Sequence, residues 1–499
     1  MLSKSKYCAF VQCPKNLWLK AYHPELATPD ASLESRLADG NEIGDLAMGL
    51  FGDFVEVSAY GENGKIDLAE MMRRTDELIA KGTPVICEAS FSYNGNYCAV
   101  DILKREGNGY AIYEVKSSTE VKPIYVADVA YQKYVLEHCG ISVSGTYLVC
   151  INSDYVFDGT LKLDEFFKII DLSDKVAKEL PSVEGNVQAA NAILAMDSAP
   201  ACDLSEGCHT PYDCVFWEHC SAHLPHPSVF DVYGAGFGFK KKLAYYQKGC
   251  ASFAALSQEK EIMKNRIRSL QIHHALEDLA THVDKQGIRE FLDLLTFPLY
   301  FLDFETVEPI IPEFVGTTPF TQIPFQYSLH YLTSADGELK HKEFLAVSGE
   351  DPRRALAEQL CADIPRDVCV LAYNKGFECG RIHELAVSFP DLAEHLLSIE
   401  KNIIDLIVPF RAGHYYNRSM GGSFSIKSVL PAIFPNDPAL DYHNLEGVHH
   451  GGEAMTLFPK IKDMPPEEQA VARHNLLKYC ELDTYAMVKV WEELVRVTR

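Results

Sequence analysis

The pattern of apolar and polar positions predicts alternating strands and helices in the N-terminal part of the chain. Apolar runs near 85 to 116 and 144 to 152 have the length and residue content of strands, and a helical pattern covers about 125 to 138. A further helical pattern opens the chain. This mixture predicts an α/β domain over residues 1–225 that ends in a cysteine-rich segment.

A second alternation of strands and helices begins at the sequence FPLYFLDFET and ends in the helical pattern HNLLKYCELDTYAMVKVWEELV. Between the two lie residues 226–298, where SQEKEIMKNRIRSLQ has a long, charged helical pattern. We therefore expect an α/β protein of two domains, 1–225 and 299–499, joined by a helical connector at 226–298. The length of 499 residues agrees, because it exceeds what one compact core holds.

Composition narrows the classes of function. The formal net charge of −24 argues against broad electrostatic binding of nucleic acid, although bound metal ions can still attract phosphates. The sequence contains no apolar run of about 18 to 20 residues and no apolar signal core at its start, so we expect a cytoplasmic protein without a membrane span. Fifteen cysteines in such a protein favour metal ligation over a disulfide framework.

The stretch YFLDFET places two carboxylates, Asp303 and Glu305, on one face of an apolar strand. Like charges side by side repel and resist burial, so one interpretation is an edge strand with a solvent-exposed face. The other is a pair of ligands for a divalent cation, whose charge cancels the repulsion.

A two-metal site needs more acids than these two, and the downstream sequence supplies them. In VLAYNKGFECGRI a strand leads into a helix that begins near Glu378, where a negative charge suits the helix dipole. In KYCELDTYAM, Tyr479 and Asp483 lie four residues apart on one helical face. The tyrosine hydroxyl could position an attacking water.

The ordered set Asp303-x-Glu305, Asn374-x-x-Phe377-Glu378 and Tyr479-x-x-x-Asp483 resembles the DnaQ-like, ribonuclease H-fold 3′-5′ exonucleases of the tyrosine-bearing DEDD type. The resemblance covers about 299 to 499. It implies that Asp303, Glu305, Glu378 and Asp483 are metal ligands and that Tyr479 orients the nucleophilic water. The second motif departs from the family pattern, because Glu378 stands where aspartate is usual.

An acidic hairpin forms the candidate site of the N-terminal domain. In YCAVDILKREGNGYAIYEVKSS one strand carries Asp101, a Gly-Asn-Gly turn follows, and the next strand carries Glu114 and Lys116 on one face. Two acids can hold a divalent metal while the lysine orients or activates a water for phosphodiester attack. An ion-paired hairpin without a metal is the alternative.

Regularly spaced cysteines occur at the end of this domain. Cys208, Cys214 and Cys220 lie in short succession, and Cys13 near the start could complete a set of four. Four thiolates can hold a [4Fe-4S] cluster or a zinc ion. Cys202 and Cys8 are a fifth and a sixth candidate, and reduced cysteines without a ligand are the alternative.

Residues 1 to 222 resemble the RecB-like PD-(D/E)XK nucleases that carry an iron-sulfur cluster, including the CRISPR-associated ones. The resemblance rests on LSKSKYCAFVQCPKNLWL, the hairpin with Asp101, Glu114 and Lys116, VAYQKYVLEHCGI and the cysteines. It implies metal-dependent DNA cleavage and a restriction-endonuclease-like fold. It also assigns roles to single residues: Cys13, Cys208, Cys214 and Cys220 as cluster ligands, Gln132 as a helix-borne catalytic residue, and Glu42 as a metal ligand where many relatives use histidine.

Together these features predict a metal-dependent nuclease with two hydrolytic sites that processes or degrades DNA ends in repair or defence. The expected cofactors are a [4Fe-4S] cluster and Mg²⁺ or Mn²⁺, and the expected partners are nucleic acid, DNA rather than RNA, and proteins of a repair or defence complex. Two alternatives remain: a nucleic-acid-binding scaffold in which one or both nuclease sites are inactive, and a cluster that acts as a redox sensor.

Three other features have local explanations as well as functional ones. His449, His450 and Glu453 could bind a metal, but the neighbouring double glycine suits a loop. Lys427 could contact phosphate or lie in a surface turn before a helix. The mixture of lysine and tyrosine in FKKKLAYYQKG could follow a single strand or form an exposed helix face.

Overall fold

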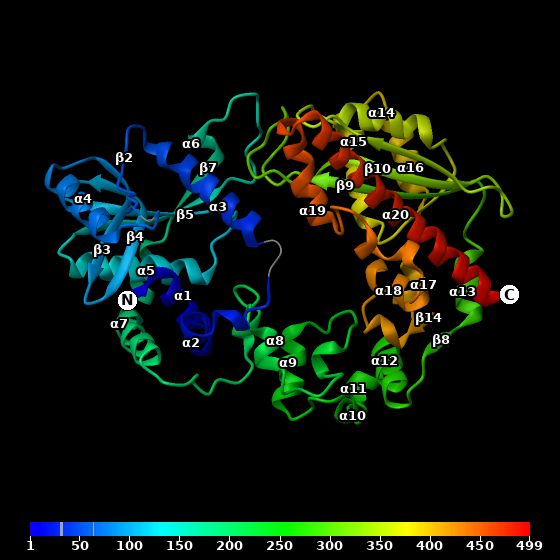
Figure 1. Cartoon of the computed structure of the whole chain (residues 1–499), viewed down its shortest axis with the longest axis horizontal. Coiled ribbons are helices and arrows are strands. Elements are labelled where there is room, and N and C mark those ends of the chain that lie inside the picture. Colours follow the sequence, from blue (N-terminus) through cyan, green and yellow to red (C-terminus); the bar gives the residue numbers. More distant parts are fainter. Residues whose placement is uncertain (30–32, 63) are drawn as a thin grey trace. The chain divides into compact units, whose positions relative to one another are not determined.

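The computed structural model describes residues 1–29, 33–62 and 64–499 (Figure 1). It divides into two compact units of mixed α/β structure, which confirms the expected α/β class at this level. The first unit comprises Met1–His223 with Ile310–Phe320, and the second comprises Leu224–Pro309 with Thr321–Arg499. Residues 226–298, expected to form a connector, thus belong to the second unit. Every helix in the described part of the chain is too short or too polar to cross a bilayer.

The sheet of the first unit has, within the described residues, seven strands in the order β2-β3-β4-β5-β6-β7, and β1 pairs with the start of β4. The predicted hairpin is confirmed: β4 and β5 are antiparallel, and Glu106 pairs with Gly109 across the turn. A side chain at Gly109 would place a Cβ 2.5 Å from the Ser142 carbonyl oxygen, so only glycine fits. The strands are β1 (Leu2–Ser3), β2 (Val55–Glu56), β3 (Val85–Tyr93), β4 (Asn96–Glu106), β5 (Gly109–Lys116), β6 (Val143–Ile151) and β7 (Phe167–Asp171).

Helices cover both faces of this sheet. Alternate residues of β5 explain why: Ile112 packs with the residues of α5 on one face, whereas Ala111 and Tyr113 pack with Ile43 of α3 on the other. Glu114 and Lys116 therefore point to the face that α1 and α5 cover. The helices are α1 (Lys4–Gln12), α2 (Pro14–Tyr22), α3 (Leu33–Met48), α4 (Leu68–Ala80), α5 (Pro123–His138), α6 (Leu163–Phe166), α7 (Ser173–Leu194) and α8 (Trp217–Ser221).

The main sheet of the second unit has, among the described residues, five strands in the order β11-β10-β9-β12-β13. β10 is antiparallel to both of its neighbours, β11 and β9, whereas β9, β12 and β13 are parallel to one another. Because β9 pairs on both sides, the edge-strand interpretation of YFLDFET is wrong. The strands are β8 (Thr281–Val283), β9 (Leu299–Val307), β10 (Ile323–Leu332), β11 (Lys340–Leu345), β12 (Cys369–Ala372), β13 (Ile403–Asp405) and β14 (Tyr415–Asn417), of which β8 and β14 form a separate pair.

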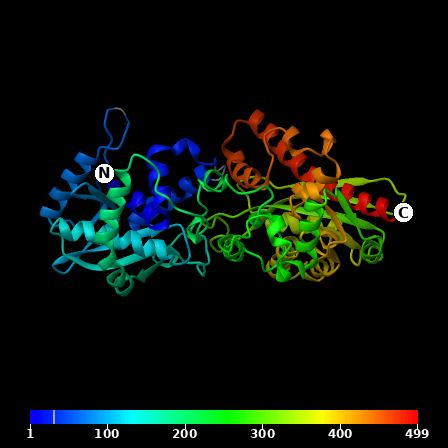
Figure 2. The same cartoon turned by 90° about the horizontal axis from the view of Figure 1, so that it is seen from below.

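The C-terminal helix α20 lies along one face of this sheet, beside β9 and β10 (Figures 1 and 2). The opposite face packs on α14, α15 and α16, because Tyr300, Leu302 and Phe304 share a core with these helices. The remaining helices precede the sheet or surround α20. The helices are α9 (Phe239–Gln247), α10 (Phe253–Leu256), α11 (Lys260–Met263), α12 (Arg266–Leu276), α13 (Lys285–Leu292), α14 (Arg353–Asp363), α15 (Gly376–Ser388), α16 (Ala393–Lys401), α17 (Val408–Arg411), α18 (Ile426–Ile433), α19 (Gly451–Leu457) and α20 (Pro466–Thr498).

One local prediction differs from the structure. The charged pattern SQEKEIMKNRIRSLQ forms the two short helices α11 and α12 in place of one long helix. Asn265 separates them, and its side chain accepts a hydrogen bond from the backbone N–H of Arg268 and so caps α12. An asparagine at this position competes with helix continuation, since its side chain satisfies the free N–H groups of a new helix start.

Candidate functional site

Four carboxylates of the second unit come together from three elements. Asp303 and Glu305 project from β9, Glu378 lies in the first turn of α15, and Asp483 lies on α20. Period-2 alternation explains the first pair, because the residues between and before them face the opposite core. Three of the four are at most 8 % exposed, and Asp303 is partly buried. The structure thus brings together all four acids that the sequence singled out here.

Burial and mutual repulsion raise the pKa values of these carboxyl groups. Burial, followed by the charges of Asp483, Glu378 and Glu305, raises the pKa of Asp303 well above its usual value. Burial and Asp483 raise the pKa of Glu305 to about 8. Burial raises the pKa of Glu378 to about 8 and that of Asp483 to about 6. The site therefore needs positive charge to hold all four groups ionised.

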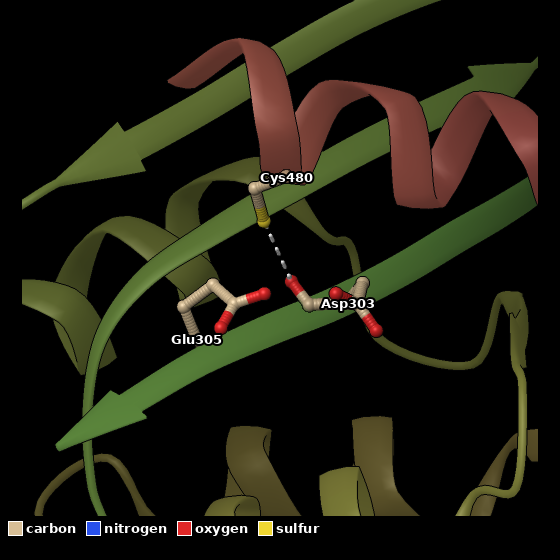
Figure 3. Close-up of side chains that lie close together, drawn as sticks. All are labelled: Asp303, Glu305 and Cys480. Atoms are coloured by element: carbon tan, nitrogen blue, oxygen red, sulfur yellow. Dashed lines mark hydrogen bonds between the residues drawn. The ribbon is translucent and has the colours of Figure 1, made fainter. Parts of the chain in front are cut away.

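A thiol completes the closest group of possible metal ligands within the described residues: Asp303, Glu305 and Cys480 each offer an atom within 4.8 Å of the others (Figure 3). Cys480 lies on α20 and donates a hydrogen bond of 3.9 Å to the backbone carbonyl of Asp303. Burial and the charges of Asp303, Glu305 and Asp483 raise the pKa of this thiol well above its usual value. Cys480 therefore acts as a donor that packs α20 on β9.

Two tyrosines and a lysine border the acids. Lys427, in the first turn of α18, donates a hydrogen bond of 3.0 Å to the hydroxyl of Tyr479. Tyr442 donates one of 2.6 Å to Oδ1 of Asp483. The Lys427 ammonium also lies 5.1 Å from the ring centre of Tyr442 and 5.2 Å from that of Tyr479. Because Lys427 occupies a lone pair of the Tyr479 oxygen, it leaves the hydroxyl proton free to donate.

The start of α15 is shaped by Asn374, which ends the turn after β12. Its φ of +67° lies in the left-handed region, which asparagine tolerates better than most residues. Its backbone N–H donates to Oδ1 of Asp405 at 2.8 Å, and its side chain accepts from Arg411 at 3.1 Å. This turn directs Glu378 toward the other acids. Oε2 of Glu378 is buried and has no hydrogen-bond partner in the described part of the chain.

A cavity of about 420 Å³ adjoins the acids. Its lining includes Asp303, Asp483, Asn374 and Arg411. A cavity lined by two carboxylates and a guanidinium can take an anionic group that contacts the guanidinium and a cation bound to the carboxylates.

The acidic hairpin of the first unit is also assembled with its predicted partners. Lys116 Nζ lies 2.5 Å from Oε1 of Glu114. Asp101 lies on the neighbouring strand, and its Oδ2 accepts a hydrogen bond of 2.8 Å from the backbone N–H of Val115. Gln132 on α5 donates a hydrogen bond of 2.7 Å to Oε2 of Glu114. Asp101, Glu114, Lys116 and Gln132 therefore form one cluster, with Glu114 fully buried at its centre.

Two residues that the sequence did not single out join this cluster. Asp128, one helical turn before Gln132, accepts from Lys116 at 3.0 Å and from Gln132 at 3.0 Å. Lys4 Nζ lies 2.9 Å from Asp101 and 3.1 Å from Glu114. Glu42, by contrast, has an exposed side chain on α3. Among the described residues, the side chains that donate hydrogen bonds to Glu114 are those of Lys4, Lys116 and Gln132.

Glu88 is a further acid near this cluster. Glu88 lies opposite Asp101 in the register of β3 against β4, between the pairs Cys87–Ile102 and Ala89–Val100, and its φ of +57° is unusual for a residue with a side chain. Burial, followed by the charge of Asp101, raises its pKa to about 7. Glu88 therefore adds an acid with a raised pKa near Asp101.

Five cysteines surround one small pocket in the first unit. They are Cys13, Cys202, Cys208, Cys214 and Cys220, and Trp217 and Phe216 line the same pocket. The loop that carries Cys208 approaches the end of α1 closely: Gln12 donates 2.9 Å to the Gly207 carbonyl, and a Cβ at Gly207 would lie 2.4 Å from the Gln12 carbonyl oxygen. The predicted set of four therefore comes together with the fifth candidate. Cys8, the sixth, lies near the acidic cluster instead: burial, followed by the charge of Asp128, raises the pKa of its thiol.

The cysteine loop contacts the acidic cluster through two tyrosines. Tyr212, between Cys208 and Cys214, donates a hydrogen bond of 2.9 Å to the hydroxyl of Tyr125 on α5. The ring of Tyr125 lies 5.5 Å from Lys116 Nζ. The loop and the lysine are thus joined by a short path of side-chain contacts.

Two of the three weaker features take structural roles, whereas Lys427 borders the acids. His450 caps α19 by accepting from the backbone N–H of Glu453, and Glu453 pairs with both His449 and His450. The double glycine is therefore part of a helix start, and the expectation of a loop is wrong. In the lysine- and tyrosine-rich helix α9, Lys242 donates to the Phe230 carbonyl and is partly buried.

The sequence patterns did not predict four residues of the two sites: Lys4, Asp128, Tyr442 and Cys480. Asp128 had a signal, because it lies one helical turn before Gln132 on the same face of α5. Cys480 also had one, because it directly follows Tyr479. Lys4 and Tyr442 had none, because their partners lie on elements far away in the sequence.

Comparison with known proteins adds three similarities. Residues 300–425 match a family model described as a domain of unknown function, DUF2779. A stretch of 224 residues is 29% identical to the uncharacterized protein UU173 of Ureaplasma parvum, and it covers 40% of this chain and 31% of that relative. Another of 211 residues is 26% identical to the uncharacterized protein MG366 homolog of Mycoplasma pneumoniae, covering 38% of this chain and 31% of that relative. The chain thus spans less than a third of the length of these relatives, and the DUF2779 segment contains Asp303, Glu305 and Glu378.

Proposed function

We propose that this chain is a metal-dependent nuclease with two hydrolytic sites that processes or degrades DNA ends. The observation that carries the proposal is the convergence of Asp303, Glu305, Glu378 and Asp483. Four buried carboxylates repel one another, and bound divalent cations are the groups that offset such repulsion. Tyr479 and Lys427 beside them supply a hydroxyl and an ammonium group at the edge of the same site.

The donor set of the second unit fits Mg²⁺ or Mn²⁺. Both ions prefer carboxylate oxygens, and the buried Oε2 of Glu378 lacks any other partner among the described residues. When bound, such an ion stabilises negative charge on a phosphate and lowers the pKa of a water. Asp303, Glu305, Glu378 and Asp483 would hold the metal.

The other residues of this site would position the reacting groups. The Tyr479 hydroxyl, which accepts from Lys427, is free to donate toward an attacking water or Asp483. Arg411 lines the cavity beside the acids, where it could hold an anionic phosphate. The Lys427 ammonium lies at the Tyr479 hydroxyl. The sheet order β11-β10-β9-β12-β13, with a mixed pattern of antiparallel and parallel pairs, supports a ribonuclease H-like exonuclease domain.

The first unit would hold the second hydrolytic site, in a PD-(D/E)XK domain. Asp101 and Glu114 offer oxygen ligands for one divalent ion. Lys116, which contacts both Glu114 and Asp128, would orient a water or the phosphate. Gln132 fixes the rotamer of Glu114 through its 2.7 Å hydrogen bond.

The thiolates of the cysteine pocket are the donor set of an iron-sulfur cluster. The same thiolates could bind a zinc ion. A cluster would be held by four of Cys13, Cys202, Cys208, Cys214 and Cys220, and it would join the start of the first unit to its end.

Cleavage of single-stranded DNA labelled at its 5′ or 3′ end, with Mn²⁺ present, tests the two-site proposal. We expect Asp303→Asn and Lys116→Met each to remove one distinct product series and leave the other. Asp336→Asn in an exposed loop and Lys133→Met on the surface of α5 serve as matched controls and should keep both series. The same strands made of RNA measure the preference between the two nucleic acids.

Each other result has a defined meaning. If neither Asp303→Asn nor Lys116→Met changes the products, the assigned sites are wrong. Tight DNA binding without metal-dependent cleavage in any sample would favour the alternative of a nucleic-acid-binding scaffold.

A further inference from the structure

Lys4 is placed where a metal ion would be expected in the first unit. Its Nζ lies 2.9 Å from Oδ1 of Asp101 and 3.1 and 3.2 Å from the two carboxylate oxygens of Glu114. These oxygens belong to the two carboxylates that are the best candidates for metal ligands. Lys4 is the first residue of α1, and β1 positions that helix by pairing with β4, the strand that carries Asp101.

The ammonium group of Lys4 is well held in this position. Its side chain is 24 % exposed, and it faces one carboxylate that is fully buried and one that is 21 % exposed. Lys4 therefore places an ammonium group between the carboxylates of Asp101 and Glu114.

The charge balance of the cluster limits how many ions it can accept. Asp101, Glu114 and Asp128 face the ammonium groups of Lys4 and Lys116, so three negative charges meet two positive ones. Glu88 adds at most one more negative charge. One divalent ion brings such a set close to neutrality, whereas a second would leave an excess of positive charge in a largely buried place, which is unfavourable.

We propose that Lys4 is a built-in cation of the first unit's nuclease site: it takes the place of a second metal ion and competes with the first for Asp101 and Glu114. The inference rests on the proposed function, because it assumes that these two carboxylates bind a divalent ion. It goes beyond that function by assigning a one-metal site and a residue that sets its metal affinity. An ion that binds Asp101 and Glu114 must displace the Lys4 ammonium from their oxygens, and the displaced group is then within reach of a bound phosphate.

Binding of Mn²⁺ to the full chain tests this proposal without measuring cleavage. The free ion gives an electron paramagnetic resonance signal that bound Mn²⁺ does not, so a titration yields both the number of ions and their Kd. All proteins carry Asp303→Asn and Asp483→Asn to weaken binding in the second unit. Five chains are compared: this background, and the background with Lys4→Gln, Lys4→Met, Lys6→Gln or Glu114→Gln.

We expect the background to bind one Mn²⁺ that is lost with Glu114→Gln. Lys4→Gln should tighten the Kd of that ion at least about tenfold, because it removes a unit charge a few ångströms from the ion. Lys6→Gln is the matched control: Lys6 lies on the same helix, and its Nζ donates to the Met1 carbonyl, so the Kd should stay the same. Lys4→Met, neutral and similar in length, should act like Lys4→Gln, and circular dichroism shows which variants fold.

The outcomes separate this proposal from the proposed function. A Glu114-dependent ion whose Kd is unchanged or weaker in folded Lys4→Gln and Lys4→Met overturns the role of Lys4 and leaves the metal site in place. Two Glu114-dependent ions in the background would overturn it as well. Mn²⁺ binding that is the same with and without Glu114→Gln would remove the metal site of the first unit, and the inference with it.

Discussion

The hydroxyl of Tyr442 donates a hydrogen bond of 2.6 Å to Oδ1 of Asp483, across 41 residues of sequence. Tyr442 is 9 % exposed, and its ring lies 6.0 Å from that of Tyr479. The bond lowers the pKa of Asp483, which burial otherwise raises. Tyr442 therefore orients a candidate metal ligand and favours its ionised form.

Replacing Tyr442 by phenylalanine should weaken the exonuclease site of the second unit. A hydrogen bond to a charged group is worth about 1.5 to 3 kcal/mol, so Tyr442→Phe should lower the rate of the Asp303-dependent product series by about tenfold to a hundredfold. The rate is measured at saturating Mn²⁺ with end-labelled DNA. Tyr300→Phe is the matched control, because Tyr300 lies on β9 but packs in the opposite core against Tyr331. Equal rates in the two variants would contradict the role of Tyr442.

The raised pKa values in the second unit predict how stability depends on pH. Glu305 and Glu378 have pKa values of about 8, whereas carboxyl groups of an unfolded chain titrate near pH 4. Between these values the folded state binds more protons than the unfolded state, so the free energy of unfolding contributed by these groups falls as pH rises. We expect the Tm in EDTA to fall between about pH 5 and about pH 8, and Mg²⁺ to restore it at the upper end.

A substitution isolates this contribution from other titrating groups. Glu305→Gln keeps the shape of the side chain but cannot ionise, so it should raise the Tm in EDTA at about pH 8 and flatten the pH dependence. Each kcal/mol changes the Tm of such a domain by about 2 to 4 °C. Glu343→Gln, at an exposed position on β11, should leave the pH profile as it is. A profile with the same slope in Glu305→Gln would show that this carboxyl is ionised in the folded state without a metal.

The cysteine pocket predicts which thiols hold iron. Cys13→Ser and Cys208→Ser should each lose iron and acid-labile sulfide, because each removes one of the four ligands expected for the cluster. Cys139→Ser is the control, since Cys139 is exposed at the end of α5. Cys202→Ser should keep its iron, as expected for the set of Cys13, Cys208, Cys214 and Cys220. Stoichiometric zinc without iron in anaerobically purified protein would contradict the cluster.

The contact between Tyr212 and Tyr125 predicts that the cysteine loop affects the nuclease site of the first unit. Tyr212→Phe removes the 2.9 Å hydrogen bond that joins the loop to α5, near Lys116. We expect the Lys116-dependent product series to slow by about threefold to tenfold while the iron content stays the same. Tyr233→Phe is a suitable control, because Tyr233 is similarly exposed and lies in the second unit. A loss of iron together with activity would instead assign Tyr212 a role in holding the loop.

Local sequence determined the strands and helices, and it determined which candidate site residues share a face of one strand or helix. Period-2 alternation placed Asp303 and Glu305 on one strand face, and a spacing of four placed Tyr479 and Asp483 on one helix face, because these periodicities follow from backbone geometry alone. The hairpin turn likewise brought Asp101 beside Glu114. Such features depend on residues close in sequence, and the structure agrees with them.

Only the tertiary structure decided which distant groups complete each site. Lys4 reaches Glu114 across 110 residues, and Lys427 reaches Tyr479 across 52. No periodicity connects such pairs, because their contact depends on how α1 packs on its sheet and how α18 packs on α20. Burial was decided in the same way: the sequence YFLDFET also allows an exposed edge strand, and the packing of α20 on this face of β9 and β10 covers its carboxylates. Their burial raises their pKa values.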